Sequence, residues 1–116
     1  TASVFEGAAS PRERIRRQAR AMFGFYERVP AVRSLHRDRH LIRELAPFAD
    51  EEARNRRALA AGAVGAAGEA ALVAALVDIA VYQSLRREGF AAADAAERIA
   101  TLINTALEAA PGAIGR

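Results

Sequence analysis

Two polar side chains in the most apolar part of the chain are the residues best suited to chemistry. From Leu72 to Tyr82 the only charged residue is Asp78. Asp78 and Tyr82 are four residues apart, so in a helix they share one face. Inside an apolar pocket such a pair would orient a ligand by hydrogen bonding or charge. The alternative is structural: Asp78 pairs with an arginine of another helix, because a lone buried carboxylate is costly, and Tyr82 fills the core.

Large apolar side chains form a second group of candidates. Met22, Phe23 and Tyr26 follow one another at helical spacing, and side chains of this kind usually form the core. They would equally serve as the wall of a pocket, since a cavity in a helical bundle is core left unfilled. We therefore place Phe23 and Tyr26 among the expected ligand-binding residues.

Two histidines could bind a ligand or a metal. His36 and His40 lie four residues apart in the stretch HRDRH. Helical zinc sites use this spacing in H-E-x-x-H, but here an arginine follows the first histidine, and only Asp38 or Glu44 could add a third ligand. We expect no metal and no cofactor. The histidines are expected either at the solvent or, for one of them, in contact with a ligand. The expected ligand-binding set is Phe23, Tyr26, His36, His40, Asp78 and Tyr82.

Other chemistry is disfavoured by the sequence. The stretch GAVGAAG does not have the glycine spacing of a nucleotide-binding loop, and no G-K-[ST] follows it. The chain has no Cys, and neither Ser34 nor Ser84 lies in a nucleophile elbow, so we do not expect an enzyme. The arginines of RERIRRQAR could contact phosphates, but they are spread around the helix. A solvated face is the preferred interpretation, and a contact between domains is the alternative.

Composition limits the architecture and the location of the protein. The 116 residues are 52% hydrophobic and 27% charged, as expected for one globular domain with one core. No apolar run approaches the roughly 18 residues needed to cross a bilayer, and the start is not a signal peptide, so we expect a cytoplasmic protein without a membrane partner. All 17 Lys or Arg residues are arginine, and the net charge of +3 combines −1 from Glu6, +6 over residues 12–57 and −2 over residues 58–116.

The periodicity of apolar residues predicts an all-α domain over residues 1–116. No stretch alternates at period two, and no hairpin signal is present. Capping residues, prolines and glycines suggest a bundle of about five helices. The expected ranges are Pro11–Arg28, Ala31–Leu45 stopped by Pro47, a third helix that starts after Asp50 and loses definition between Gly62 and Gly68, Glu69–Glu88 ended by Gly89, and Ala92–Ala109.

The expected fourth helix is apolar on all sides, and such a helix must be covered on all sides. The first three helices of so small a domain are expected to cover only part of it. A second copy of the chain would cover the rest, through the last two helices of each subunit in a four-helix interface. The expected interface residues are Leu72, Leu76, Ile79, Ile99, Leu102, Ile103 and Ala106.

The segment ALVDIAVYQSLRREGFAAADAAERIATLINTAL resembles the end of the C-terminal domain of TetR/AcrR-type transcriptional regulators. The family pattern is an apolar helix, an L-x-x-x-G ending (here Leu85 to Gly89), a restart near Asp94, and a final amphipathic helix. The upstream PRERIRRQARAMFGFYERVPAVRSL is similar to the family's earlier helices. The chain departs from the pattern at Ala91, where the family often has a Ser or Thr cap, and it lacks the N-terminal helix-turn-helix domain.

The resemblance implies an effector-binding and dimerisation domain. A small, largely apolar molecule would bind between the earlier helices and the penultimate one. Binding would change the spacing of two DNA-reading domains, so operator DNA would be a partner only through the missing N-terminal domain. The alternative is a structural helical interaction module without a small-molecule site. A sensor is expected to contain a closed apolar cavity, whereas an interaction module would be packed solid.

Overall fold

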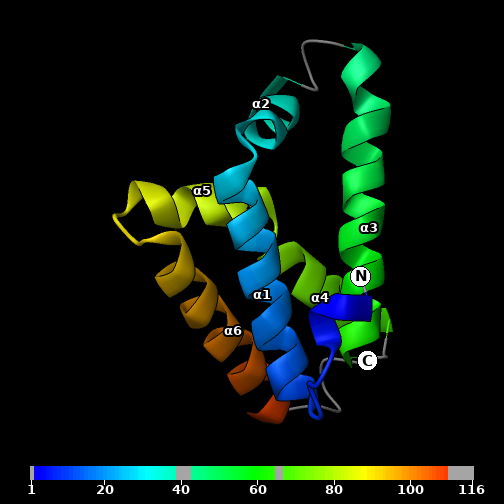
Figure 1. Ribbon diagram of the computed structural model, residues 1–116, viewed down its shortest axis with the longest axis vertical. Coiled ribbons are helices and arrows are strands. Elements are labelled where there is room, and N and C mark those ends of the chain that lie inside the picture. Colours follow the sequence, from blue (N-terminus) through cyan, green and yellow to red (C-terminus); the bar gives the residue numbers. More distant parts are fainter. Residues whose placement is uncertain (1, 39–42, 65–66, 110–116) are drawn as a thin grey trace.

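All secondary structure in the described residues is helical (Figure 1). The structure is a computed structural model, and it describes residues 2–38, 43–64 and 67–109. Their α-helices are α1 (Pro11–Arg28), α2 (Pro30–Asp38), α3 (Ala46–Val64), α4 (Ala67–Leu76), α5 (Ile79–Arg87) and α6 (Ala92–Ala109). Short 3-10 helices, η1 (Ala2–Phe5) and η2 (Arg43–Leu45), precede α1 and α3. The prediction of an all-α fold is confirmed for this part of the chain.

Local capping signals place α1 and α6 where the sequence predicts them. Ser10 caps α1: its Oγ accepts a hydrogen bond from Glu13 N at 3.2 Å, and Pro11 occupies the first turn. At the other end of the fold, Gly89 follows α5 with φ +99°, a left-handed conformation that suits glycine. Phe90 N bonds to Leu85 O at 3.1 Å, and this closes the turn that leads into α6.

The predictions for the second and third helices are partly wrong. The second was expected over Ala31–Leu45, but α2 ends at Asp38 and Arg43–Leu45 form the separate η2, with residues 39–42 outside the described part. The third was expected to start after Asp50, but α3 begins at Ala46. Pro47 therefore lies in the first turn of α3 rather than ending the preceding helix, because the missing N–H is not needed there.

The expected fourth helix, Glu69–Glu88, is broken into α4 and α5. Asp78 causes the break: it is the N-cap of α5, with φ −65° and ψ 153°, and its Oδ1 accepts a hydrogen bond from Ile79 N at 2.7 Å. Aspartate competes for backbone N–H groups and so favours caps over helix interiors. The sequence interpretation gave Asp78 a ligand or an ion-pair partner and overlooked this third role.

α1 is the central helix of the bundle (Figure 1). It packs against α6 on one side and against α3 on the other, while α4 and α5 close the remaining side. α3 and α4 also pack against each other, on either side of the glycine-rich region where the expected third helix loses definition. The core consists mainly of α1, α4 and α6 side chains, with Ile15, Val73 and Ile103 at 0% exposure.

The chain itself covers most of the apolar stretch that was expected to need a partner. Val73, Val77, Ile79 and Tyr82 are buried, and the exposed positions within Leu72–Tyr82 are alanines. The helices of one chain, α6 included, therefore cover more of this stretch than was expected of the first three helices alone, while Leu72, Leu76 and Val81 are half-buried. The break at Asp78 explains it, because two shorter helices at an angle bury different faces.

The predicted interface residues divide into two groups in the single chain. Ile79, Ile99 and Ile103 are buried in its own core, and Leu72 and Leu76 are half-buried. Leu102 is 63% exposed, and Ala106, one turn further along α6, is also exposed. Dimerisation stays a prediction, and its most accessible contacts are on the outer face of α6.

Candidate functional site

Three of the predicted ligand-binding residues form one aromatic cluster. Phe23 and Tyr26 come from α1 and Tyr82 from α5; their ring centroids are 5.5 Å (Tyr26–Tyr82), 5.6 Å (Phe23–Tyr82) and 6.3 Å (Phe23–Tyr26) apart. All three are at most 3% exposed. Rings at these separations attract one another in addition to the area that they bury. This cluster is packed core, which matches the structural alternative for Tyr82.

The two tyrosine hydroxyls point to polar groups at the edges of the cluster. Tyr26 donates a hydrogen bond to the buried carbonyl of Val77 at 3.0 Å, and its hydroxyl lies 3.3 Å from Glu52 Oε1. Tyr82 donates to Glu27. Burial, and then the charge of Glu52, raise the pKa of Tyr26 above its ordinary value of about 10. Tyr26 therefore ties α1 to the last carbonyl before the α4–α5 break.

Arg56 of α3 lies at the centre of a partly buried ion-pair network. Its Nη1 is 2.8 Å from Glu52 Oε2 and 3.0 Å from Asp78 Oδ1. The Arg56 side chain is only 11% exposed. Asp78 thus pairs with an arginine of another helix, as the structural interpretation of the sequence held, while a direct role in ligand binding stays a prediction. Through this network α3 holds the cap of α5 in place.

The surroundings of Arg56 favour its positive charge but do not provide a hydrogen-bond partner for every N–H group that is described. Burial lowers the pKa of Arg56, but the negative charges of Glu52 and Asp78 outweigh burial, so the pKa is raised above its ordinary value. The buried Arg56 Nε has no hydrogen-bond partner among the described residues. Loss of the guanidinium would leave two carboxylates close together without their cation.

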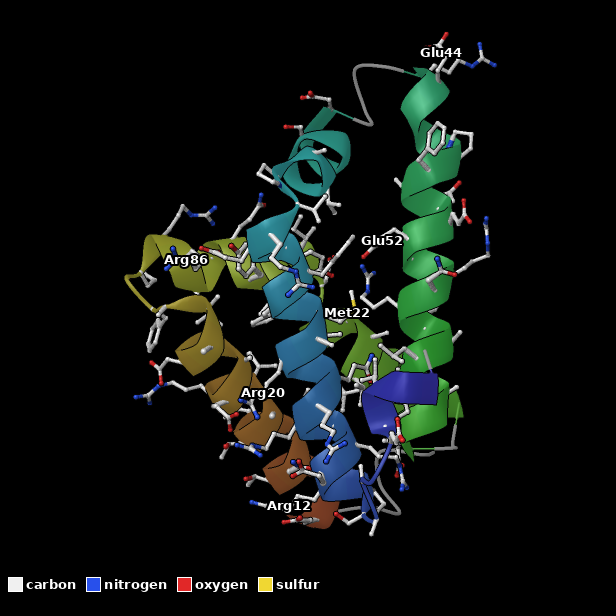
Figure 2. All side chains as sticks on the ribbon, in the orientation of Figure 1. Arg12, Arg20, Met22, Glu44, Glu52 and Arg86 are labelled. Atoms are coloured by element: carbon white, nitrogen blue, oxygen red, sulfur yellow. The ribbon has the colours of Figure 1, made fainter. Side chains whose placement is uncertain are left out.

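A groove opens beside this network, between α1, α2 and α3. Its volume is about 420 Å³, and Figure 2 shows Met22 of α1 and Glu52 of α3 in the space between these two helices. Five apolar side chains form most of its walls: Met22, Phe25, Val32, Phe48 and Leu59. Phe48 is 60% exposed, so the groove is accessible to solvent.

Four polar residues of α3 complete the groove: Glu51, Glu52, Asn55 and Arg56. Glu52 and Arg56 are engaged with each other. Glu51 is exposed, and no described residue pairs with it. Such a combination of apolar walls and a few polar groups is typical of small-molecule sites.

The groove is next to the predicted site but is not the predicted site. Phe23, Tyr26 and Tyr82 do not line it, and Asp78 is connected to it through its ion pair with Arg56. Its α3 residues were overlooked, although Phe48, Glu52, Asn55 and Leu59 follow the spacing i, i+4, i+7, i+11 of one helix face. The expectation that α3 begins after Asp50 removed Phe48 from that face.

The predicted histidine pair cannot be placed in this site. The side chain of His36 and the whole of His40 lie outside the described residues. Within the described residues, no group of three or more His, Asp or Glu side chains could hold a metal ion.

The arginine-rich start of α1 serves contacts within the chain. Arg12 pairs with Glu108 at 2.6 Å, and Arg16 pairs with Glu97 at 2.9 Å, so that α1 is tied to α6. Arg14 Nε donates to Ala63 O of α3 at 3.0 Å. Arg12 and Arg20 lie along the side of α1 that faces α6 (Figure 2). These contacts favour a structural, solvated role for RERIRRQAR.

Comparisons with family models, curated proteins and solved structures find no match to this chain. Within the described residues, the helices are too short or too polar for any of them to cross a membrane.

The raised pKa of Tyr26 predicts a loss of stability in alkaline solution. The unfolded tyrosine ionises near its ordinary pKa of about 10, whereas the folded one keeps its proton. The unfolded state then binds fewer protons, so the free energy of unfolding falls by about 1 kcal/mol between pH 10 and pH 11 because of this group. Chemical denaturation at both pH values should show this loss in the wild type but not in Tyr26→Phe. Equal losses in the two proteins would contradict the burial of the phenol.

Proposed function

We propose that this chain is the effector-sensing and dimerisation region of a TetR-like transcriptional regulator, in which a small, largely apolar molecule controls DNA binding by a separate helix-turn-helix domain. The observation that carries the proposal is the groove between α1, α2 and α3, with apolar walls and polar groups on one side. Its volume of about 420 Å³ lies within the range of ordinary ligand sites. The family resemblance of the sequence supplies the link to transcription.

Arg56 gives this groove a physical route to the rest of the domain. The side chain lines the groove and at the same time pairs with Asp78, which caps α5. A ligand that shifts Arg56 relative to Asp78 would alter the cap and the junction of α4 with α5. A ligand can shift a conformational equilibrium only by such a difference in contacts. The junction leads directly to the helices that are expected to pair two subunits.

A direct test is to block the groove without disturbing the core. Asn55 is exposed and lines the groove, whereas Arg54 is exposed on the same helix outside it. Isothermal titration calorimetry with the neutral probe 4-phenylbutanol should show binding to the wild type and to Arg54→Trp. Asn55→Trp should bind at least about tenfold more weakly, because the indole occupies the ligand space. Equal affinities for both variants, or no binding to the wild type, would refute the groove as an effector site.

Dimerisation is tested separately at the exposed leucine of α6. Leu102 is 63% exposed, and a glutamate there would bring charge into the expected interface. We expect Leu102→Glu to raise the dimer dissociation constant at least about tenfold in sedimentation equilibrium, since an unpaired charge in an apolar interface is costly. The matched control is Ala58→Glu, which adds the same charge to an exposed position of α3. A wild-type monomer at all concentrations would contradict the pairing.

The solid aromatic core favours one other candidate, a helical interaction module without a small-molecule site. Phe23, Tyr26 and Tyr82 pack against one another and are at most 3% exposed, as expected for core side chains. An open groove with an exposed Phe48 could also receive an apolar side chain of a partner protein. Absence of probe binding in the calorimetry, together with an intact fold, would favour this module over the sensor.

A further inference from the structure

We infer that the molecule bound in the groove is an organic cation with an apolar body, such as an aromatic or alkyl ammonium. This inference rests on the proposed function, because it names the ligand class of the same groove. The observations that carry it are the charges of the groove lining, the state of their pairing and the nature of the walls.

The polar side of the groove has an excess of negative charge. Glu51 and Glu52 line it, and Arg56 is the single cation among the described lining residues. Arg56 is shared with a further carboxylate, that of Asp78, at 3.0 Å. Two carboxylates, those of Glu52 and Asp78, therefore share the guanidinium of Arg56, and Glu51 adds a third negative charge in the described part of this region. Glu52 and Asp78 offset the positive charge of Arg56, so Arg56 would attract an anionic ligand only weakly. The negative charge of Glu51 would repel such a ligand.

Glu51 is the carboxylate that is available to a ligand. Glu52 already bonds to Arg56 through both of its oxygens, at 2.8 and 2.9 Å. Glu51 is exposed and has no ion-pair partner among the described residues. A ligand ammonium near it would gain a charge-assisted hydrogen bond without breaking an existing ion pair.

The walls suit the apolar body of such a cation. Two phenyl rings, Phe25 and Phe48, line the groove beside Met22. Aromatic faces attract organic cations, and a cation that also buries apolar area benefits from both effects. A hydrophilic cation such as a free metal ion would leave these walls exposed to water, so the chemistry favours an amphipathic organic molecule.

Three probes with the same apolar body isolate the effect of charge: 4-phenylbutylammonium, 4-phenylbutanol and 4-phenylbutyrate. Calorimetry at pH 7 and low salt should show about tenfold tighter binding of the ammonium than of the alcohol, with the carboxylate weakest. The preference should shrink as salt is added, because this side of the groove is open to screening. An alcohol or carboxylate that binds as tightly as the ammonium would overturn the inference while leaving the groove a ligand site.

A pair of conservative variants assigns the preference to Glu51. Glu51→Gln should reduce the advantage of the ammonium over the alcohol to about threefold. Asp50→Asn removes the same charge from the neighbouring exposed position, which does not line the groove, and should preserve the advantage. Equal effects of the two variants would show general attraction rather than recognition by Glu51 and would overturn the assignment. Failure of all three probes to bind would refute the inference and the proposed function together.

Discussion

Replacement of Arg56 by alanine is expected to lower the free energy of unfolding by about 3 kcal/mol, because removing one partner of a buried ion pair leaves uncompensated charge behind. The carboxylates of Glu52 and Asp78 would stay close together, with side chains that are only 20% and 26% exposed. The free energy of unfolding of an ordinary domain is roughly 5–15 kcal/mol, so the expected loss is a large share of the stability of the whole domain. Guanidinium unfolding measures it directly.

Two further variants separate the charge of Arg56 from its packing. Arg54→Ala removes an exposed arginine from the same helix and should change stability by no more than about 0.5 kcal/mol. The triple variant Arg56→Met, Glu52→Gln, Asp78→Asn removes all three charges and should regain most of the loss, because neutral groups of similar shape need no compensation. A cost of Arg56→Ala similar to that of Arg54→Ala would contradict a structural network.

Truncation of Phe23 to alanine is expected to be as damaging as loss of Arg56 or more so, at about 4 kcal/mol. Phe23 is 0% exposed and packs against Tyr26 and Tyr82, so its removal leaves a cavity between α1 and α5. Because the variant could fail to fold, Phe23→Leu serves as a milder form, with an expected loss of about 1.5 kcal/mol or less. Both losses are measured by denaturant unfolding.

The same variants decide between the predicted pocket role of Phe23 and its role as core. Phe23→Leu should leave the affinity for 4-phenylbutanol unchanged. Phe48→Ala should have the opposite effects. It should lower the affinity for 4-phenylbutanol several-fold, but it should change the free energy of unfolding by no more than about 0.5 kcal/mol, since Phe48 is 60% exposed. Weaker binding of 4-phenylbutanol to Phe23→Leu would instead support a ligand site at the aromatic cluster of Phe23, Tyr26 and Tyr82.

Local signals made the ends of some elements predictable. Ser10, Pro11 and Gly89 act on their own turns through capping bonds and backbone conformation, so no knowledge of the rest of the fold is needed. The long apolar stripe of α6 likewise depends only on spacing. These are the parts of the fold that sequence patterns describe well.

The site depended on contacts between elements and was harder to predict. Asp78 has a cap role that is local and an ion pair with Arg56 that joins residues 22 positions apart. Periodicity shows that α3 has several apolar and polar positions but not which of its faces meets α1. A proline such as Pro47 is compatible with the end of one helix or with the first turn of the next. The first was expected from the sequence, so Phe48 was not expected in α3, where the structure places it.

The most direct test of the central claim is to map the binding of the tightest of the three phenylbutyl probes by amide chemical-shift changes in the ¹⁵N-labelled chain. The account predicts large changes along residues 48–59 of α3, and a second set at Asp78 and Ile79, transmitted through Arg56. It predicts little change on the outer face of α6 around Leu102. Changes confined to α6, or an undisturbed α3, would contradict a ligand site in the groove and its link to the α4–α5 junction.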